Sequence, residues 1–289
     1  MNNKFLNKFC KVLTVIFAVL AIFLITDYVL SEITDIYAYE DAVGDDAEWN
    51  KITEKIENKT ELTDEDYAEI FLQSGLGKPA VDKFVSENDV EKIQEYRDYY
   101  LLDKEYYCFR KGVFACHERI TDISGEEIRH PDFADLQNGD IIVTLSIHSL
   151  GWRHGHSTII TDAENGVGVQ AVMVGEKSNN TQAYSWRKYP LVAVLRPKDT
   201  STEVRNQAAL YAEENLKGLY YSLFGGIFSG RDAEKPLKTT QCAHLVWYSY
   251  MVNGIDIAPE SGRIITPKDF LKSENLEIVQ VYGNITDLI

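Results

Sequence analysis

Basic residues are scarce relative to acidic ones in this chain of 289 residues. It contains 29 Lys and Arg against 45 Asp and Glu, for a formal net charge of −16. Charges balance within residues 1–38, so the rest of the chain carries the whole excess. Proteins that bind nucleic acid neutralise its phosphates with Lys and Arg. The composition therefore excludes nucleic acid as a main ligand.

Cysteine is also scarce, and each of the four cysteines needs its own interpretation. Cys108 and Cys116 lie close together in YYCFRKGVFAC, which predicts either a hairpin with a disulfide or two buried thiols. Cys10 precedes the apolar N-terminal run and is not placed like a lipidated cysteine. Cys242 has no obvious partner, and a lone cysteine in an exported protein calls for a functional explanation.

Long apolar stretches are missing except for one near the N-terminus, at Val12–Ile25. Three lysines precede this stretch. A basic flank before such a run is typical of a secretory signal or a single membrane anchor, with a buried core helix as the alternative. We therefore interpret residues 1–38 as a signal peptide, with cleavage conceivable after Ala38, or as an anchor. The remainder is then extracytoplasmic, either secreted or tethered to the membrane.

Residues 45–105 are expected to form a small helical module. The stretch ELTDEDYAEIFLQSGLG begins with a capping box, Thr63 and Asp66, and ends at Gly75. Apolar residues spaced three and four apart predict a second helix over 88–102. The acidic stretch AVGDDAEWN before them is interpreted as a linker.

From Tyr106 onward the pattern changes to short strands. YYCFRKGVFA predicts a hairpin with Lys111-Gly112 at its turn, and LQNGDIIVTLS, HSTIITDAENGVGVQAVMVG and YPLVAVLRP predict further strands. A helix is expected over 202–217, and QCAHLVWYSYMVNG predicts a helix that is apolar on every side and therefore buried. Residues 106–289 are thus expected to be an α+β domain in which an antiparallel sheet packs on one central helix.

Cys242 and His156 are the residues that point to catalysis. A threonine cap at Thr239-Thr240 would place Cys242 in the first turn of the buried helix, where amide hydrogens and the helix dipole favour a thiolate. His156 opens the strand HSTIIT after a glycine and is expected at the edge of the sheet, facing that helix. Together they predict a nucleophile and its base.

A catalytic histidine needs a third group to fix its tautomer. Gln170, on the partner strand of the same hairpin, is the candidate, with Glu176 in reserve. An amide orients the ring but supplies no charge.

Three segments, NGDIIVTLS, GHSTIITDAENGVGVQA and TTQCAHLVWYSYMVNGIDI, resemble the NlpC-type cell-wall hydrolase superfamily. More narrowly, they are similar to its circularly permuted papain-like branch, which includes YiiX-like proteins and lecithin retinol acyltransferase. The residues that match in order are Gly139-Asp140, His156, Gln170, Cys242 and Leu245-Val246, and Tyr220-Tyr221 resembles a tyrosine-containing loop before the cysteine.

The resemblance covers roughly residues 135–257 and implies a permuted papain-like fold and cysteine hydrolase activity, without a cofactor. Three features depart from the family pattern. Ala243-His244 stands where relatives often have Ser-Glu, Gln170 stands where YiiX-like members tend to have Glu, and the loop between His156 and Gln170 is slightly longer. These leave the Cys/His pair intact and make its third member less secure.

The function that we expect is hydrolysis of an amide bond in a peptidoglycan peptide by an exported thiol amidase or peptidase. One alternative is an acyltransferase or lipid hydrolase that uses the same pair, since the permuted branch includes such enzymes. Another is an inactive binding module. A zinc site at His154, His156, Cys242 and His244 is a third, although residues 242 and 244 of a helix point about 200° apart. The oligomeric state stays open.

Overall fold

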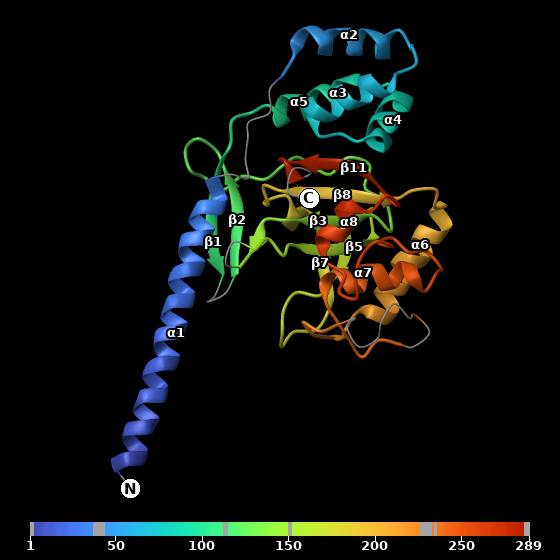
Figure 1. The fold of residues 1–289 in the computed structure, drawn as a ribbon. Helices are drawn as coiled ribbons and strands as arrows, with labels where there is room; N and C mark the ends of the chain where they lie inside the picture. The colour runs from blue at the N-terminus through green and yellow to red at the C-terminus, as the bar shows by residue number, and fades with distance from the viewer. Residues whose placement is uncertain are drawn as a thin grey trace.

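The computed structural model of the protein describes residues 3–36, 44–111, 115–149, 152–225, 233 and 236–285. The first helix, α1 (Asn3–Ile36), is long, and its N-terminal part extends away from the rest of the molecule (Figure 1). Its stretch Lys8–Val29 has a mean hydropathy of 2.6 and is long and apolar enough to cross a membrane. A signal peptide or anchor at this position is consistent with this helix, as expected from the sequence.

A group of helices follows α1 and lies at one end of the molecule (Figure 1). Thr63 and Asp66 form the expected capping box of the second of these helices, and Gly75 ends it in the left-handed conformation with φ +70°. The linker interpretation was wrong at its C-terminal end, because Asp45 caps a helix there through the N–H groups of Ala47 and Glu48. The helices of this module are α2 (Asp46–Glu57), α3 (Asp64–Ser74), α4 (Lys78–Glu87) and α5 (Val90–Tyr100).

The main sheet has six strands in the order β11-β8-β3-β5-β6-β7, and all neighbours are antiparallel. Its centre is apolar on both faces, because Ile141, Ile142 and Val143 of the central strand are all fully buried. Its strands are β3 (Ile141–Thr144), β5 (His156–Asp162), β6 (Val167–Gln170), β7 (Asn179–Gln182), β8 (Val192–Pro197) and β11 (Leu276–Tyr282).

A smaller sheet, in the order β1-β2-β4, lies beside α1 (Figure 1). Its strands are β1 (Glu105–Lys111), β2 (Ala115–Thr121) and β4 (Ile147–His148). The predicted hairpin exists, but Lys111 still pairs within β1, opposite Ala115, instead of belonging to the turn. Gly112 lies outside the described residues. Cys108 and Cys116 are thiols, so of the two predicted alternatives the structure has the one without a disulfide.

Helices cover both faces of the main sheet. One core cluster joins Ile141, Ile159 and Val169 of the sheet to α6 (Thr202–Tyr211), α7 (Cys242–Met251) and α8 (Pro267–Lys272). The other joins the opposite face, including Ile142, Ile160 and Val194, to α2–α5. The helical module therefore shares its core with the sheet. The fold is α+β with antiparallel sheets, as expected.

The Gly139-Asp140 pair has a structural role. Gly139 has φ +88°, and a side chain there would collide with the Tyr250 hydroxyl, which donates to the Gly139 carbonyl at 2.6 Å. Asp140 is fully buried and accepts two hydrogen bonds of 2.8 Å from Arg196. Burial nevertheless raises the pKa of Asp140 to about 6. The contacts of Gly139 and Asp140 thus connect the start of β3 to α7 and β8.

Candidate active site

Cys242 is the first residue of α7, as the sequence predicts. The helix is apolar on all sides, and every residue from Cys242 to Tyr250 is buried. The predicted threonine cap was wrong. Gln241 caps the helix, and its Oε1 accepts from the Ala243 N–H at 2.9 Å, while Thr239–Thr240 form β10, which pairs in parallel with β9 (Tyr220–Tyr221). The glutamine reaches this position because its Nε2 also donates to the Ile265 carbonyl at 2.6 Å.

The Cys242 thiol is buried, with 7% of the residue exposed. It donates to Gln241 Oε1 at 3.6 Å. Burial raises the pKa of Cys242, while the backbone N–H groups of Ser157 and Ala243 and the Ser157 hydroxyl act in the opposite direction. The expected lowering by the helix terminus is therefore present but smaller than the cost of desolvating a thiolate. The resting state favours a neutral thiol.

His156 is the first residue of β5 and is hydrogen bonded to Gln170. Its Nε2 lies 2.8 Å from Gln170 Oε1, and Gln170 Nε2 in turn donates to Asn179 Oδ1 at 3.4 Å. An amide oxygen only accepts, so His156 Nε2 carries the hydrogen and Nδ1 keeps its lone pair. The ring is thus held in the tautomer that a base needs.

An aromatic side chain fixes the same ring from behind. The Trp186 indole stacks on the His156 imidazole, with ring centroids 5.0 Å apart and an interplanar angle of 7°. Trp186 comes from the 3₁₀-helix η1 (Ala183–Trp186) and belongs to the core cluster on the face of the sheet opposite α7. Ser157, the next residue of β5, contacts the thiol on the α7 face. Successive side chains of a strand point to opposite faces, so these contacts place the His156 ring on the face opposite α7, and the expectation that His156 faces this helix was wrong.

The strand register explains how Gln170 reaches His156. Gln170 is directly opposite Thr158, two residues beyond His156. Residues two apart on a strand share a face, so the glutamine side chain lies diagonally across from the histidine. The reserve candidate, Glu176, is exposed on the loop after β6, where its carbonyl accepts from the Tyr221 N–H at 2.9 Å. Of these two residues, Gln170 is accordingly the one that is hydrogen bonded to the imidazole.

The four residues of the alternative zinc site have different surroundings. His154 precedes β5, lies 3.4 Å from the Ser149 hydroxyl and packs edge-on against Trp152. His244 stacks on Trp247, with centroids 5.7 Å apart, and burial lowers its pKa to about 4. Across the described residues, no group of three or more His, Cys, Asp or Glu is arranged to hold a metal ion.

An apolar rim borders the candidate site. Tyr221 lies within electrostatic range of the thiol. Burial, and in second place the charge of a Cys242 thiolate, raise the pKa of Tyr221. Two loops next to it, 171–178 and 219–225, are joined by backbone hydrogen bonds such as Ser178 N–H to Leu219 O at 2.8 Å. The exposed side chains of this rim are Met173, Val174, Tyr220, Leu223 and Phe224.

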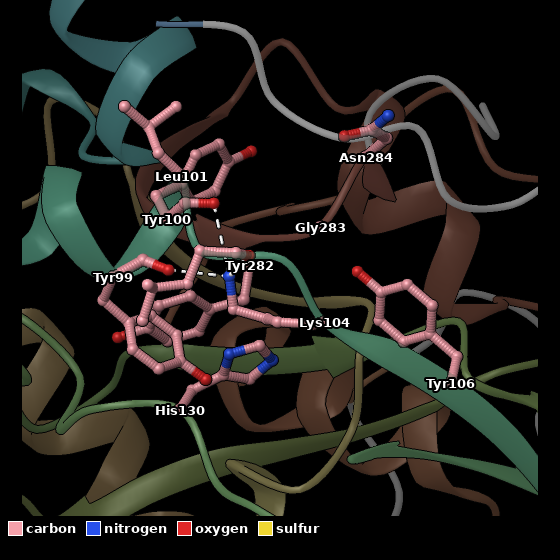
Figure 2. Close-up of a pocket in the computed structure, with 10 residues that line it drawn as sticks. Tyr99, Tyr100, Leu101, Lys104, Tyr106, His130, Tyr282, Gly283 and Asn284 are labelled. Atoms are coloured by element: carbon pink, nitrogen blue, oxygen red, sulfur yellow. Dashed lines mark hydrogen bonds between the residues drawn. The ribbon is translucent and has the colours of Figure 1, made fainter. Parts of the chain in front are cut away.

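A separate small cavity lies where α5 meets the end of β11, and it shares no residue with the Cys242 site (Figure 2). Its volume is about 30 Å³. Lys104 crosses it and donates to the carbonyls of Tyr99 at 2.6 Å and Tyr100 at 3.3 Å, at the C-terminal end of α5. His130 stacks on Tyr282 beneath it, with centroids 4.0 Å apart. This region joins the module to the sheet.

Gln241, Ser157 and Trp186 were not singled out by sequence reasoning. Gln241 directly precedes Cys242, and Ser157 directly follows His156. Their adjacency to the candidate catalytic residues could have identified them in the sequence. Trp186 lies 30 positions from His156 in the sequence and carries no local motif.

Comparisons with known proteins give one structural likeness. No family model matches the chain, and no curated protein matches it. A crystal structure described as the metalloprotein yiiX from Escherichia coli O157:H7 is similar, with a TM-score of 0.39 and 16% sequence identity, over 50% of this chain and 96% of that chain. That protein belongs to the YiiX-like group that the sequence resembles.

Proposed function

We propose that the protein is an exported cysteine hydrolase in which Cys242 is the nucleophile, His156 the base and Gln170 the residue that orients His156. The observation that carries the proposal is the hydrogen bond of 2.8 Å between His156 Nε2 and Gln170 Oε1, at the point of β5 where α7 presents its first-turn thiol. A histidine with an orienting amide, one residue along β5 from the Ser157 contact with the Cys242 thiol, supports these roles of base and nucleophile. The permuted papain-like fold is part of the same proposal.

The chemistry follows from the tautomer. Cys242 Sγ attacks the carbonyl carbon of the scissile bond while its proton moves to His156 Nδ1. The oxyanion accepts a hydrogen bond from the Cys242 N–H, because Gln241 already occupies the Ala243 N–H. The intermediate collapses as His156 returns the proton to the leaving amine, and water then hydrolyses the thioester.

The substrate that we propose is a peptide amide bond of the cell wall. Support comes from the apolar N-terminal helix, which has the length and composition of a signal peptide or membrane anchor, and from the family resemblance of the three motif segments. The specific observation that favours a second candidate is the apolar rim beside Tyr221. Exposed Leu223 and Phe224 suit a fatty acyl chain, which would make the same thioester chemistry an acyl transfer or lipid hydrolysis.

The test is alkylation of the native protein with iodoacetamide, following each cysteine by mass spectrometry across pH. Cys242 should react at neutral pH, and His156→Ala should slow it at least about tenfold, since general bases contribute 10²-fold or more. The matched control is His154→Ala, which should leave the rate unchanged. Equal rates in wild type and His156→Ala, or a Cys242 that reacts only after unfolding, would overturn the proposal. Purified cell-wall peptides and acyl esters then distinguish the two substrate classes.

A further inference from the structure

The apolar stretch of α1 matches the thickness of a bilayer. Lys8–Val29 has 22 residues, which at 1.5 Å per residue span about 33 Å, against about 30 Å of hydrocarbon. Its side chains are exposed in the structure, with Ile22 at 65% and Ile25 at 64%. An exposed apolar cylinder of this length needs a lipid environment.

One acidic side chain near the end of the stretch fastens this helix to the folded domain. Asp27 is fully buried, and its Oδ2 accepts a hydrogen bond of 2.7 Å from Arg110 Nη1 on β1. The Arg110 guanidinium also lies 6.0 Å from the centre of the Tyr28 ring. Charged groups near the end of a membrane span are tolerated when they are paired. The ion pair thus holds α1 and the small sheet in one geometry.

Strand directions place one end of the small sheet toward the bilayer. Figure 1 shows β1 beside α1, running from the helical module toward the N-terminal end of α1. Arg110 pairs with Cys116 of β2, which pairs with His148 of β4. Because β4 runs in the same direction as β1, Ser149 lies beyond the level of Asp27, toward the apolar part of α1.

Exposed aromatic side chains gather at this level. Trp152 follows β4, is held by two backbone hydrogen bonds to Ser149 of 2.9 and 3.0 Å, and is 65% exposed. Phe109 of β1 is 51% exposed and Tyr28 of α1 is 57% exposed. Trp and Tyr concentrate at the headgroup level of membranes, where their rings are partly buried and their polar atoms stay hydrated.

We propose that α1 is retained as a membrane anchor and that the end of the β1-β2-β4 sheet that carries Phe109 and Trp152 docks in the headgroup region of the bilayer that α1 crosses. The segment from Trp152 leads directly into His156, so this contact holds the candidate site at the membrane surface. The proposal does not depend on the reaction proposed above, and its test uses no substrate.

The experiment exploits the tryptophans of the chain. Trp49, Trp186 and Trp247 are at most 2% exposed, which leaves Trp152 as the exposed one of the four. The full chain is placed in lipid nanodiscs of phosphatidylcholine and phosphatidylglycerol with bromine at shallow acyl positions. Brominated lipid should quench most of the emission that Trp152 contributes, and Trp152→Phe should abolish that quenching.

The matched control is a variant in which the exposed tryptophan is moved from position 152 to the helical module. Leu72 of α3 is 64% exposed in the module, at the end of the molecule away from the N-terminus of α1 (Figure 1). Leu72→Trp in a Trp152→Phe background should be quenched by aqueous iodide and not by brominated lipid. Asp27→Leu keeps the helix apolar but removes the ion pair, and should weaken the lipid quenching of Trp152. The proposal is overturned if iodide quenches Trp152 and brominated lipid does not. It is also overturned if mass spectrometry shows that the mature chain lacks α1.

Discussion

Gln170 contacts the His156 ring through one hydrogen bond of 2.8 Å and adds no charge. Such an amide fixes the tautomer without stabilising the imidazolium that forms when the base accepts a proton. Trp186 restricts the same ring by stacking. The candidate base is therefore oriented by two neutral contacts.

Gln170→Glu tests this balance. A carboxylate at the same position would stabilise the protonated ring, so the neutral base would be present only at higher pH. We expect the acid side of the pH profile of Cys242 alkylation to move to higher pH, by about one unit if the new pair resembles typical carboxylate neighbours. Gln170→Ala should lower the rate without that shift. A profile unchanged in both variants would show that Gln170 does not act on His156.

The positions of Cys242 at the start of α7 and of His156 at the start of β5 could be predicted from the sequence because each is marked by its own local signal. A lone cysteine at the start of an apolar helix and a histidine that opens a strand are visible in single segments. The stacking of Trp186 could not be predicted, because it depends on how η1 folds back over the far face of the sheet. The cap was missed because Gln241 acts through Ile265, which only the tertiary fold brings close.

Helix α7 carries a second histidine whose surroundings differ sharply from those of His156. His244 is 2% exposed, and neither of its ring nitrogens has a hydrogen-bond partner in the described structure. Desolvation alone lowers its pKa to about 4 from 6.5. A buried polar ring without partners costs stability relative to an apolar residue of similar size.

His244→Leu should therefore be neutral or stabilising at pH 7 and should change the response to acid. The unfolded chain binds a proton at His244 below about pH 6.5 and the folded chain only below about pH 4, so wild type loses up to about 3 kcal/mol as the pH falls through this window. The loss of stability in the variant should be smaller by that amount. Urea unfolding at pH 7 and pH 4 measures the free energy of unfolding of both proteins. His130, whose pKa burial lowers to about 3, is present in both, so its contribution cancels in the comparison.

If the free energy of unfolding changes equally with pH in wild type and His244→Leu, the His244 ring is hydrated or hydrogen bonded in solution. His130 offers the contrast, because its Nε2 already lies 3.0 Å from the Tyr189 carbonyl. Replacing His130 by Leu should therefore destabilise the protein at neutral pH, as loss of a buried hydrogen bond does.

At the scale of the molecule, the sequence predicted the α+β class, the long N-terminal helix and the order of the main segments. It did not predict where the helical module packs. Periodicity identifies an apolar side on each helix, but the surface that this side covers depends on contacts distant in the sequence, such as Ile70 and Val81 with Val194 and Val279 in one cluster. Helix α2 was missed although Trp49, Ile52 and Ile56, spaced three and four apart, form its buried side, because the charged residues between them are also typical of a linker.

The core cluster that the helical module shares with the main sheet gives a prediction for a fragment that begins at residue 106 and lacks the module. The chain segment Gly75–Gly77 extends the edge of the main sheet, since the Gly77 N–H donates to Val279 O at 2.9 Å and the Val281 N–H to Gly75 O at 2.7 Å. Residues 106–289 alone would expose this edge and the apolar face that the module covers. We expect that fragment to lack a cooperative unfolding transition and to bind a hydrophobic dye, as incompletely packed states do.

The control is the chain from residue 44 onward, which lacks α1 but keeps the module and the Asp45 cap of α2. It should unfold cooperatively in calorimetry, because both faces of the sheet stay covered. If residues 106–289 also unfold cooperatively, the module is an accessory that the core does not need. If neither fragment does, α1 and its Asp27–Arg110 pair are part of the folding unit, and the anchor helix stabilises the domain as well as tethering it.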